Sequence, residues 1–532
     1  MIYIKNWSEL ATDKVATDYL EQYVFPAYFN TCRWFAGKAR AQNTFQFQQL
    51  LPVSELAYIA LVEVTYHDGE PELYQLPLTI STRETPEKGV LCPTTGGRLI
   101  DAIYDEDFRK TLYNGIFSNI KLQITDNNSI TQHRTGGPAN HSIIQYQKGK
   151  GMEDTDLPAQ ISSRVLGVDS SNSALIFGEK YFFKLYRKLF EQTNPEVEMV
   201  SFLTQNAAFS HIPAFAGSFA WQRAGQPDIT LGMAQCMIKA DKDNWVLTGD
   251  FLNDFLYGVP NGLFAVKETV FDQIALLGKR TGEMHLGLYA PQAEAAFAPE
   301  PFTDAYRQFL LARLSGLLER RYALLLEKYL ELDAPTQRLA WIFMEAKELI
   351  DDFAQELLTR PLDSLRIRIH GDYHLGQVLT DNGDFILLDF EGEPEASIAD
   401  RKIKHSPLKD VAGMIRSYHY AVSAKLFNST ETQNDDPEKL LTVTDRWYKL
   451  MRDTYFDAYL EAFGWPHPLF KSQNEVNFLL LYYLLEKAVY ELGYEISYRP
   501  SWVKIPLRGI VEVIREIEKL KEPSVRISRL GK

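Results

Sequence analysis

Residues 367–394 constrain the fold of this chain more than any other stretch. They read IRIHGDYHLGQVLTDNGDFILLDFEGEP, in which two short apolar runs, 377–380 and 385–390, flank the turn-forming sequence DNGD. Asn-Gly between apolar runs is a strong signal for a tight hairpin turn. We therefore predict a β-hairpin whose two outer ends lie close together.

Acidic and amide side chains occupy the two outer ends of this hairpin. Asp372 and Gln377 lie on one side, and Asp389 and Glu391 lie on the other. One carboxylate can accept a proton from an attacking hydroxyl, while a second carboxylate and an amide oxygen hold Mg²⁺ against nucleotide phosphates. An aspartate five residues before an amide ligand is the spacing of a kinase catalytic loop. We predict Asp372 as the catalytic base, Gln377 and Asp389 as metal ligands, and a structural role for His374; ordinary polar residues at a hairpin mouth are the alternative.

A β-rich segment before the hairpin supplies a candidate phosphate anchor. ISSRVL, SALIFGE and KYFFKLYR are short runs separated by Gly, Ser and Asn, and we predict three adjacent antiparallel strands. The following sequence TNPEVEM predicts a helix capped by Asn194 with Pro195 at its first position. We predict that Lys184 binds the α- and β-phosphates and that Glu198, in preference to Glu196, fixes it; a solvated lysine is the alternative.

A serine-rich turn takes the place of a glycine-rich phosphate loop. The chain has no G-x-G-x-x-G or Walker sequence, but Ser170, Ser171, Asn172 and Ser173 lie between two predicted strands. Small hydroxyl residues and exposed backbone N–H groups can surround phosphate oxygens. Many Ser/Asn-rich turns share this composition, so phosphate binding and a plain turn both stay open on composition alone.

The periodicity divides the chain into three regions. Residues 1–130 predict an α+β unit, residues 131–245 a β-rich lobe, and residues 246–532 a helical lobe interrupted by the hairpin. A chain of 532 residues exceeds a single hydrophobic core, which agrees with several domains. The polar stretch from 125 to 150 is the predicted first boundary.

Charge and cysteine content exclude several classes of partner. With 56 basic and 70 acidic residues the formal charge is −14, which would repel nucleic-acid phosphates and anionic membranes. The 3 cysteines show no metal-ligand spacing, and the opening residues lack the pattern of a secretory signal. We expect a cytoplasmic protein without nucleic-acid or membrane partners.

Several separated blocks resemble the bacterial maltokinases. The blocks are WFAGKAR (34–40), SSNSALIFGEKYFFKLYRKL (170–189), NPEVE (194–198), LGKRTGEMHLGL (277–288), HGDYHLGQVL (370–379), LLDFEGEP (387–394), SPLKDVAGMIRS (406–417) and EKAVYELGYEISYRPSWVKIPL (486–507). The resemblance implies an α+β, bilobal protein-kinase-like fold of the aminoglycoside-phosphotransferase type, with an N-terminal α+β cap. It implies ATP and Mg²⁺ as cofactors and phosphorylation of maltose, or a related small sugar, at the anomeric hydroxyl, which would feed glycogen and α-glucan synthesis. Trehalose synthase is the protein partner that the resemblance suggests.

The resemblance also assigns residues. It supports Asp372, Gln377, Asp389 and Lys184 in the roles given above and places the Ser170–Ser173 loop over the phosphates. The family usually has Gln-Ser-Asn-Thr-Ser there, so side-chain contacts at both ends of this loop depart from the pattern. The predicted substrate-binding residues are His370, Glu391, Arg416, Tyr490, Glu491, Tyr494, Glu495, Arg499 and Trp502. Tyr490 and Tyr494 share one helix face, for which core packing is the alternative.

Three other functions stay open. The first is a kinase for another sugar or aminosugar such as glucosamine, and the second is a catalytically silent, nucleotide-binding partner of trehalose synthase. Retention of Lys184, Asp372, Gln377 and Asp389 argues against silence. The third, a glycoside hydrolase acting through the carboxylates of DFEGEP, would need no lysine or amide partner.

Overall fold

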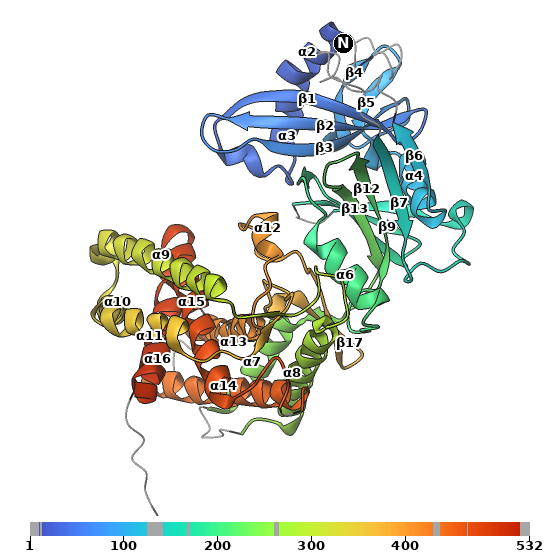
Figure 1. Cartoon of the computed structure of the whole chain (residues 1–532). Coiled ribbons are helices and arrows are strands. Elements are labelled where there is room, and N and C mark those ends of the chain that lie inside the picture. The colour runs from blue at the N-terminus through green and yellow to red at the C-terminus, as the bar shows by residue number, and fades with distance from the viewer. Residues whose placement is uncertain are drawn as a thin grey trace, which may run out of the picture. The chain divides into compact units, whose positions relative to one another are not determined.

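The computed structural model describes residue 10 and residues 13–124, 142–167, 171–259, 265–428, 437–464 and 466–521. The chain forms two compact units, Met1–Ile238 and Lys239–Lys532 (Figure 1). The boundary that we predict at residue 130 falls within 125–141, outside the described residues. Each unit is described by itself below.

The first unit opens with helices that cover a six-stranded sheet. The helical segments are α2 Lys14–Tyr19, η1 Leu20–Val24, α3 Phe25–Thr31 and η2 Ala36–Ala39. The strands are β1 Gln42–Pro52, β2 Ala57–Tyr66, β3 Glu72–Ser81, β4 Val90–Thr94 and β5 Gly97–Asp101, in the order β1-β2-β3-β5-β4, and β11 Lys188–Leu189 pairs with β3. Phe29 packs edge-on against Trp34, Phe45 and Tyr74, with ring centroids 5.0, 5.4 and 5.7 Å away. An aromatic core therefore fixes the helices on this sheet.

A seven-stranded sheet completes the first unit. Its strands are β6 Lys121–Ile124, β7 Ser142–Lys148, β8 Ser163–Leu166, β9 Ser173–Phe177, β10 Tyr181–Leu185, β12 Phe215–Arg223 and β13 Ile229–Cys236, in the order β6-β7-β12-β13-β10-β9-β8. Helices α4 Glu106–Phe117 and α6 Pro195–Gln205 and the short turns η3 Glu87–Gly89, η4 Ala102–Tyr104 and η6 Pro158–Gln160 accompany the two sheets. The antiparallel pairing of β8 with β9 and of β9 with β10 confirms the three adjacent strands predicted from the sequence.

The start of α6 also follows the sequence. The Asn194 side chain accepts a hydrogen bond from the Glu196 backbone N–H (2.8 Å), and Pro195 occupies the first turn. Asparagine satisfies a backbone donor that the helix itself cannot pair, and proline has no such donor at this position. The predicted cap is confirmed.

Helices dominate the second unit. They are α7 Asn244–Gly258, α8 Glu268–Leu288, α9 Asp304–Lys328, η8 Tyr329–Glu331, α10 Ala334–Glu345, α11 Lys347–Thr359, α12 Ile398–Arg401, α13 Leu408–Asn428, α14 Pro437–Glu461, α15 Gln473–Tyr498, η11 Pro500–Trp502 and α16 Lys504–Lys521. The short strands are β14 Lys242–Asp243, β15 Glu300–Pro301, β16 Leu365–Arg366, β17 Val378–Asp381 and β18 Asp384–Leu387, with the turn η9 Leu375–Gln377 before β17. Helix α15 packs against α9, α13 and α16, and most of its length is buried.

The length and the hydropathy of each helix decide whether it can cross a bilayer. Within the part of the chain that the structure describes, no helix combines the length and the apolar character needed to cross a bilayer.

Candidate active site

The predicted hairpin is present in the second unit. Strand β17 pairs antiparallel with β18, and the turn between them consists of Asn382 and Gly383, with φ of 50° and 82°. Two positive φ values in a two-residue turn match the twist of the flanking strands, and asparagine and glycine adopt them most readily. Local turn chemistry therefore fixes this element.

The base of the hairpin brings the two predicted metal ligands together. The Leu388 N–H donates to the Gln377 carbonyl oxygen (2.9 Å), and Gln377 Nε2 donates to Asp389 Oδ2 (3.0 Å). An amide and a carboxylate side chain thus lie beside each other, and the oxygens of such groups are the ligands that Mg²⁺ prefers. This donor set fits the ion.

Two loops meet behind these ligands. Gly371 and Gly392 both have positive φ (88° and 77°), and a Cβ atom on Gly371 would lie 3.2 Å from the Gly392 Cα. Asp389 also has a positive φ of 62°, a conformation that costs a non-glycine residue about 1 kcal/mol or more. The positive φ favours glycine at both positions; the approach of Gly392 adds to this at Gly371, and the Arg401 side chain, 3.2 Å from a Cβ atom on Gly392, adds to it at Gly392.

A buried carboxylate holds the first of these loops. Asp410 on α13 accepts the backbone N–H groups of His370 (2.8 Å) and Gly371 (2.9 Å), and it lies 3.0 Å from His285 Nε2. Burial raises the pKa of Asp410, but the hydrogen bond from His285 and the backbone donor of Gly371 outweigh burial and lower it. Asp410 and His285 lie in blocks that resemble the maltokinases, but no motif in the sequence assigns either residue a role.

The predicted base, Asp372, lies among cationic and acidic groups. Its Oδ1 is 3.4 Å from Lys487 Nζ on α15, and both side chains are about one-quarter exposed. Burial lowers the pKa of Arg401, and nearby carboxylates, among them Glu391, Asp389 and Asp372, oppose this shift. Asp372 and Asp389 therefore act on the same guanidinium, and Glu391 acts on it with them.

His374 has a structural contact. Its Nδ1 accepts the Gly376 backbone N–H (3.1 Å) at the start of η9. Burial lowers the pKa of this imidazole, and the Asp372 carboxylate opposes the shift. The neutral ring therefore shapes the turn between Asp372 and Gln377.

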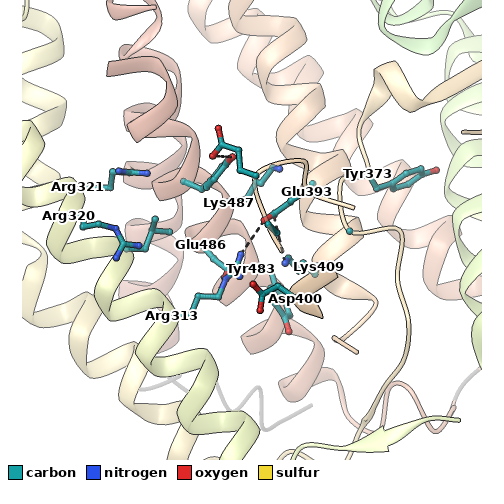
Figure 2. A pocket seen from close by; sticks show the side chains of 16 residues that line it. Arg313, Arg320, Arg321, Tyr373, Glu393, Asp400, Lys409, Tyr483, Glu486 and Lys487 are labelled. Atoms are coloured by element: carbon teal, nitrogen blue, oxygen red, sulfur yellow. Dashed lines mark hydrogen bonds and ion pairs between the residues drawn. The ribbon is translucent and has the colours of Figure 1, made fainter. Parts of the chain in front are cut away.

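A cavity of about 340 Å³ opens beside Lys487 in the second unit (Figure 2). Its charged lining consists of Arg313, Arg320 and Arg321 of α9, Glu393, Glu395 and Asp400 of the segment after β18, Lys409 of α13, and Glu486 and Lys487 of α15. Figure 2 shows Arg313, Glu393 and Lys409 pointing toward one another. Five of these side chains are cationic and four are acidic, so the cavity is polar with a small excess of positive charge.

Ion pairs hold two of the four acidic side chains of the lining. Arg313 lies 2.6 Å from Glu486 and 3.3 Å from Glu393, and Lys409 lies 3.8 Å from Glu393. Arg321 instead donates to the Val489 carbonyl oxygen (3.3 Å). None of these lining cations belongs to the substrate-binding set predicted from sequence, because α9 gives no motif that links it to the hairpin.

The structure divides the predicted substrate-binding residues. Tyr490 lines the cavity and donates its hydroxyl to Glu395 Oε2 (3.2 Å). Arg416 is buried and forms an ion pair of 2.6 Å with Glu491. His370 is buried and its Nε2 lies 2.7 Å from the Leu388 carbonyl oxygen. Among these four, only Tyr490 belongs to the cavity lining.

Glu391 lies near the Arg401 guanidinium, as described above, and the four other predicted residues form a cluster at the end of α15. The Tyr494 ring lies 4.9 Å from that of Tyr498, and the Arg499 guanidinium lies 5.3 Å from Tyr494 and 4.7 Å from Trp502. The carboxylate of Glu495 is buried and accepts a 2.6 Å hydrogen bond from Arg499. These residues come together, but none of them lines the cavity that contains Tyr490.

The first unit carries the predicted phosphate anchor. Lys184 on β10 lies 2.9 and 3.1 Å from the two carboxylate oxygens of Glu196, and Glu196 is buried. The prediction that Glu198 fixes this lysine is therefore wrong. Two helical positions correspond to about 200° of rotation, so Glu198 points away from the side of α6 that faces β10. The Tyr186 hydroxyl also donates to Glu196 (2.8 Å).

The predicted phosphate loop lies at the start of β9. Ser170 falls outside the described residues, whereas Ser171 is exposed and Asn172 is half-buried. Ser173 is buried and pairs with Leu185 across the strands, so this loop adjoins the strand of Lys184. Its hydroxyl accepts a hydrogen bond from Arg187 Nε (2.7 Å), which gives Ser173 a protein partner that the sequence did not reveal.

Comparison with known proteins finds a match to the N-terminal region and relatives that align with about two thirds of the chain. A family model described as the maltokinase N-terminal cap domain matches residues 28–105. A glucosamine kinase of Streptacidiphilus jiangxiensis is 24% identical over 357 residues, which cover 66% of this chain and 73% of that protein. A glucosamine kinase of Mycolicibacterium smegmatis is 26% identical over 359 residues, covering 66% of this chain and 80% of that protein.

Solved structures extend the likeness over nearly the whole chain. A glucosamine kinase in complex with glucosamine, ADP and inorganic phosphate covers 92% of this chain and 98% of its own, with a TM-score of 0.64 at 18% identity. A glucosamine kinase in crystal form A covers 88% of this chain and 92% of its own, with a TM-score of 0.63 at 18% identity. The predicted fold class, α+β and kinase-like with an N-terminal cap, is confirmed.

Proposed function

We propose that this chain, in which residues 28–105 match the maltokinase N-terminal cap domain and the fold is kinase-like, transfers the γ-phosphate of ATP to the anomeric hydroxyl of maltose. The observation that carries the proposal is the meeting of two loops in the second unit. Gly371 lies against Gly392, Gln377 is bonded to Asp389, and Asp372 contacts a lysine that lines a polar cavity. The groups that we assign to acid–base chemistry, to metal binding and to the acceptor thus all belong to the second unit.

In the proposed mechanism, the side chains of the second unit act on the acceptor. Asp372 accepts the proton of the anomeric hydroxyl as the oxygen attacks phosphorus, and Lys487 orients the Asp372 carboxylate. Gln377 Oε1 and the Asp389 carboxylate would hold Mg²⁺, which supplies charge stabilisation at the phosphates when bound. Asp410 keeps the loop of Asp372 in place through the His370 and Gly371 backbone.

The side chains of the first unit act on the nucleotide. Lys184, held by Glu196, would neutralise charge on the α- and β-phosphates and on the departing ADP. Ser171 and the backbone N–H groups beside it would contact phosphate oxygens. In-line transfer of this kind needs no covalent intermediate on the protein.

The balance of charge around the cavity fits a neutral sugar. Glu393 and Glu486 pair with Arg313 and Lys409, Lys487 pairs with Asp372, and Arg320 and Arg321 are matched in number by Glu395 and Asp400. Sugar hydroxyls can donate hydrogen bonds to such carboxylates and accept them from such cations, and the lining has no excess of negative charge that would attract an ammonium group. Tyr490 offers an aromatic face for a pyranose ring.

Glucosamine is the competing acceptor because the curated relatives named above are glucosamine kinases. The deciding experiment offers the protein ATP and Mg²⁺ with maltose, maltotriose, glucose or glucosamine at equal concentrations. We expect ATP consumption with maltose, and phosphorus–proton coupling in the NMR spectrum of the product should place phosphate on the anomeric oxygen. Preference for glucosamine would replace the proposed acceptor, and no ATP consumption with any sugar would favour a silent nucleotide-binding protein.

The biological setting follows from the proposed product. Maltose 1-phosphate would enter glycogen and α-glucan synthesis, and trehalose synthase, which the resemblance suggests as a partner, would supply the maltose. Co-purification of the two proteins at physiological ionic strength tests the association.

A further inference from the structure

Arg187 lies between two consecutive strands, β10 and β11, that belong to the two different sheets of the first unit. Strand β10, which carries Lys184, ends at Leu185, and β11 begins at Lys188 on the edge of β3. The Gln75 backbone N–H donates to the Arg187 carbonyl oxygen (2.9 Å). The Gln75 side chain, fully buried, donates to the Tyr186 carbonyl oxygen (2.6 Å). The backbone at Arg187 is therefore fixed by the cap strand β3.

The Arg187 side chain is fully buried and directed at the cap. Its Nη2 donates to Asp101 Oδ2 (2.5 Å), and its guanidinium lies 4.8 Å from the Trp34 ring centroid. The Tyr28 hydroxyl also donates to Asp101 (3.2 Å). Trp34, Tyr28 and Asp101 all fall within residues 28–105, the matched cap domain.

The same side chain contacts the predicted phosphate loop. Arg187 Nε donates to the Ser173 hydroxyl (2.7 Å), and the Arg187 backbone N–H donates to Asn172 Oδ1 (3.3 Å). A buried guanidinium must keep its acidic partner, since an unpaired charge in the interior is strongly unfavourable. The position of Asp101 in the cap therefore fixes where Arg187, and with it Ser173, must lie.

We propose that Arg187 is a positioning residue through which the cap holds the Asn172–Ser173 loop in its nucleotide-binding conformation. Side chains alternate along the strand, so Lys184 and Tyr186 meet Glu196 while Arg187 is directed to the cap and the loop. One short segment thus fixes both the predicted phosphate anchor and the predicted phosphate loop. The identity of the ligand rests on the proposed function; the mechanical link between cap and loop does not.

A second ion pair between cap and strand supplies a matched control. Lys188 Nζ lies 2.7 Å from Glu72 Oε1 in β3, and the lysine is about one-third exposed. This pair joins the same two parts of the chain as Arg187 and Asp101. Among the described residues, the Lys188 ammonium contacts Glu72 and not the Asn172–Ser173 loop. Lys188→Met therefore removes a cap contact without touching the proposed link.

The test compares Asp101→Asn, Ser173→Ala, their double variant and Lys188→Met in the full chain. Hydrogen–deuterium exchange is followed for the peptide that contains residues 171–177, together with KM for ATP, KM for the sugar and kcat. We expect faster loop exchange and a KM for ATP raised about tenfold in both single variants, with kcat and the sugar KM within about twofold. The KM for ATP of the double variant should not exceed that of the single variant with the higher KM, because both changes interrupt the same series of contacts.

Three outcomes would overturn the proposal: unchanged loop exchange in Asp101→Asn, additive effects in the double variant, or an equal effect in Lys188→Met. Thermal unfolding first confirms that each variant is folded. If Asp101→Asn does not fold, Tyr28→Phe, which removes one hydrogen bond to Asp101, takes its place. Wild-type protein that binds no ATP while Asp101→Asn still loosens the loop would refute the proposed function and leave the link itself supported.

Discussion

Two ion pairs one helical turn apart on α15 differ in what surrounds them. Lys487 pairs with Asp372 at 3.4 Å, with both side chains about one-quarter exposed and the lysine in the cavity lining. Glu491, four residues later, pairs with Arg416 at 2.6 Å, and the arginine side chain is 3% exposed. Both pairs come from blocks that resemble maltokinases, yet only the first contributes a side chain, Lys487, to the lining of the cavity that contains Tyr490.

The difference teaches that a shared motif mixes two kinds of residue. A partly exposed pair at a cavity can exchange its partner for substrate or proton, whereas a buried pair is costly to separate and joins the elements that carry it. We infer that Lys487 and Asp372 take part in the chemistry and that Arg416 and Glu491 join α13 to α15. The predictions that follow test this division.

The largest effect is expected at the exposed pair. Asp372→Asn keeps the shape of the side chain but removes the proton acceptor, so kcat should fall about 10³-fold or more while ATP binding and the unfolding temperature stay near wild type. Steady-state kinetics, nucleotide titration and thermal unfolding measure the three quantities. Ordinary turnover in this variant would remove Asp372 from the catalytic role.

The buried pair should respond in stability. Arg416→Met leaves the Glu491 carboxylate, which is only 13% exposed, without its partner, and the free energy of unfolding should fall by about 3 to 5 kcal/mol. Replacing both partners, Arg416→Met with Glu491→Leu, should recover most of this loss. Denaturant unfolding measures both variants. A raised KM for the sugar in a stable Arg416→Met protein would instead support the substrate contact predicted from sequence.

Lys487 should have an intermediate effect on catalysis. Lys487→Met removes the cation that orients Asp372, and kcat/KM for the sugar should fall about 10- to 100-fold. Because the pair is partly exposed, the unfolding free energy should change by about 1 kcal/mol or less. Lys487→Arg serves as the control that keeps the charge. A loss of stability as large as that of Arg416→Met would erase the distinction between the pairs.

The smallest effect is a pH dependence of stability. Burial lowers the pKa of His419, and Arg416, 3.2 Å away, lowers it further; burial also lowers the pKa of His374, but Asp372 opposes that shift. Below about pH 6.5 the unfolded chain binds a proton that the folded histidine refuses, so stability falls with acidification, by at most about 1.4 kcal/mol per such histidine at pH 5.5.

The two histidines can be separated by substitution. His419→Gln should remove more of the stability loss between pH 7.5 and 5.5 than His374→Gln, as measured by denaturant unfolding at each pH. An equal reduction in both variants would show that the Arg416 and Asp372 surroundings do not differ electrostatically as the structure indicates.

The sequence by itself determined the elements whose causes are local. Asn382-Gly383 specifies the hairpin, Asn194-Pro195 specifies the start of α6, and short β-branched and aromatic runs specify β8, β9 and β10. Turns and helix caps depend on interactions among a few neighbouring residues, so the sequence alone is sufficient to predict them. The contact of Gln377 with Asp389 follows from the same hairpin.

Tertiary structure decided which partners these elements meet. Lys184 pairs with Glu196 instead of Glu198, Asp410 binds the backbone of the Gly371 loop, and Arg313 of α9 lines the cavity. Each of these contacts joins residues far apart in the chain or depends on the rotation of a helix about its axis. Packing of whole helices and sheets sets such distances and rotations, and no local pattern encodes them.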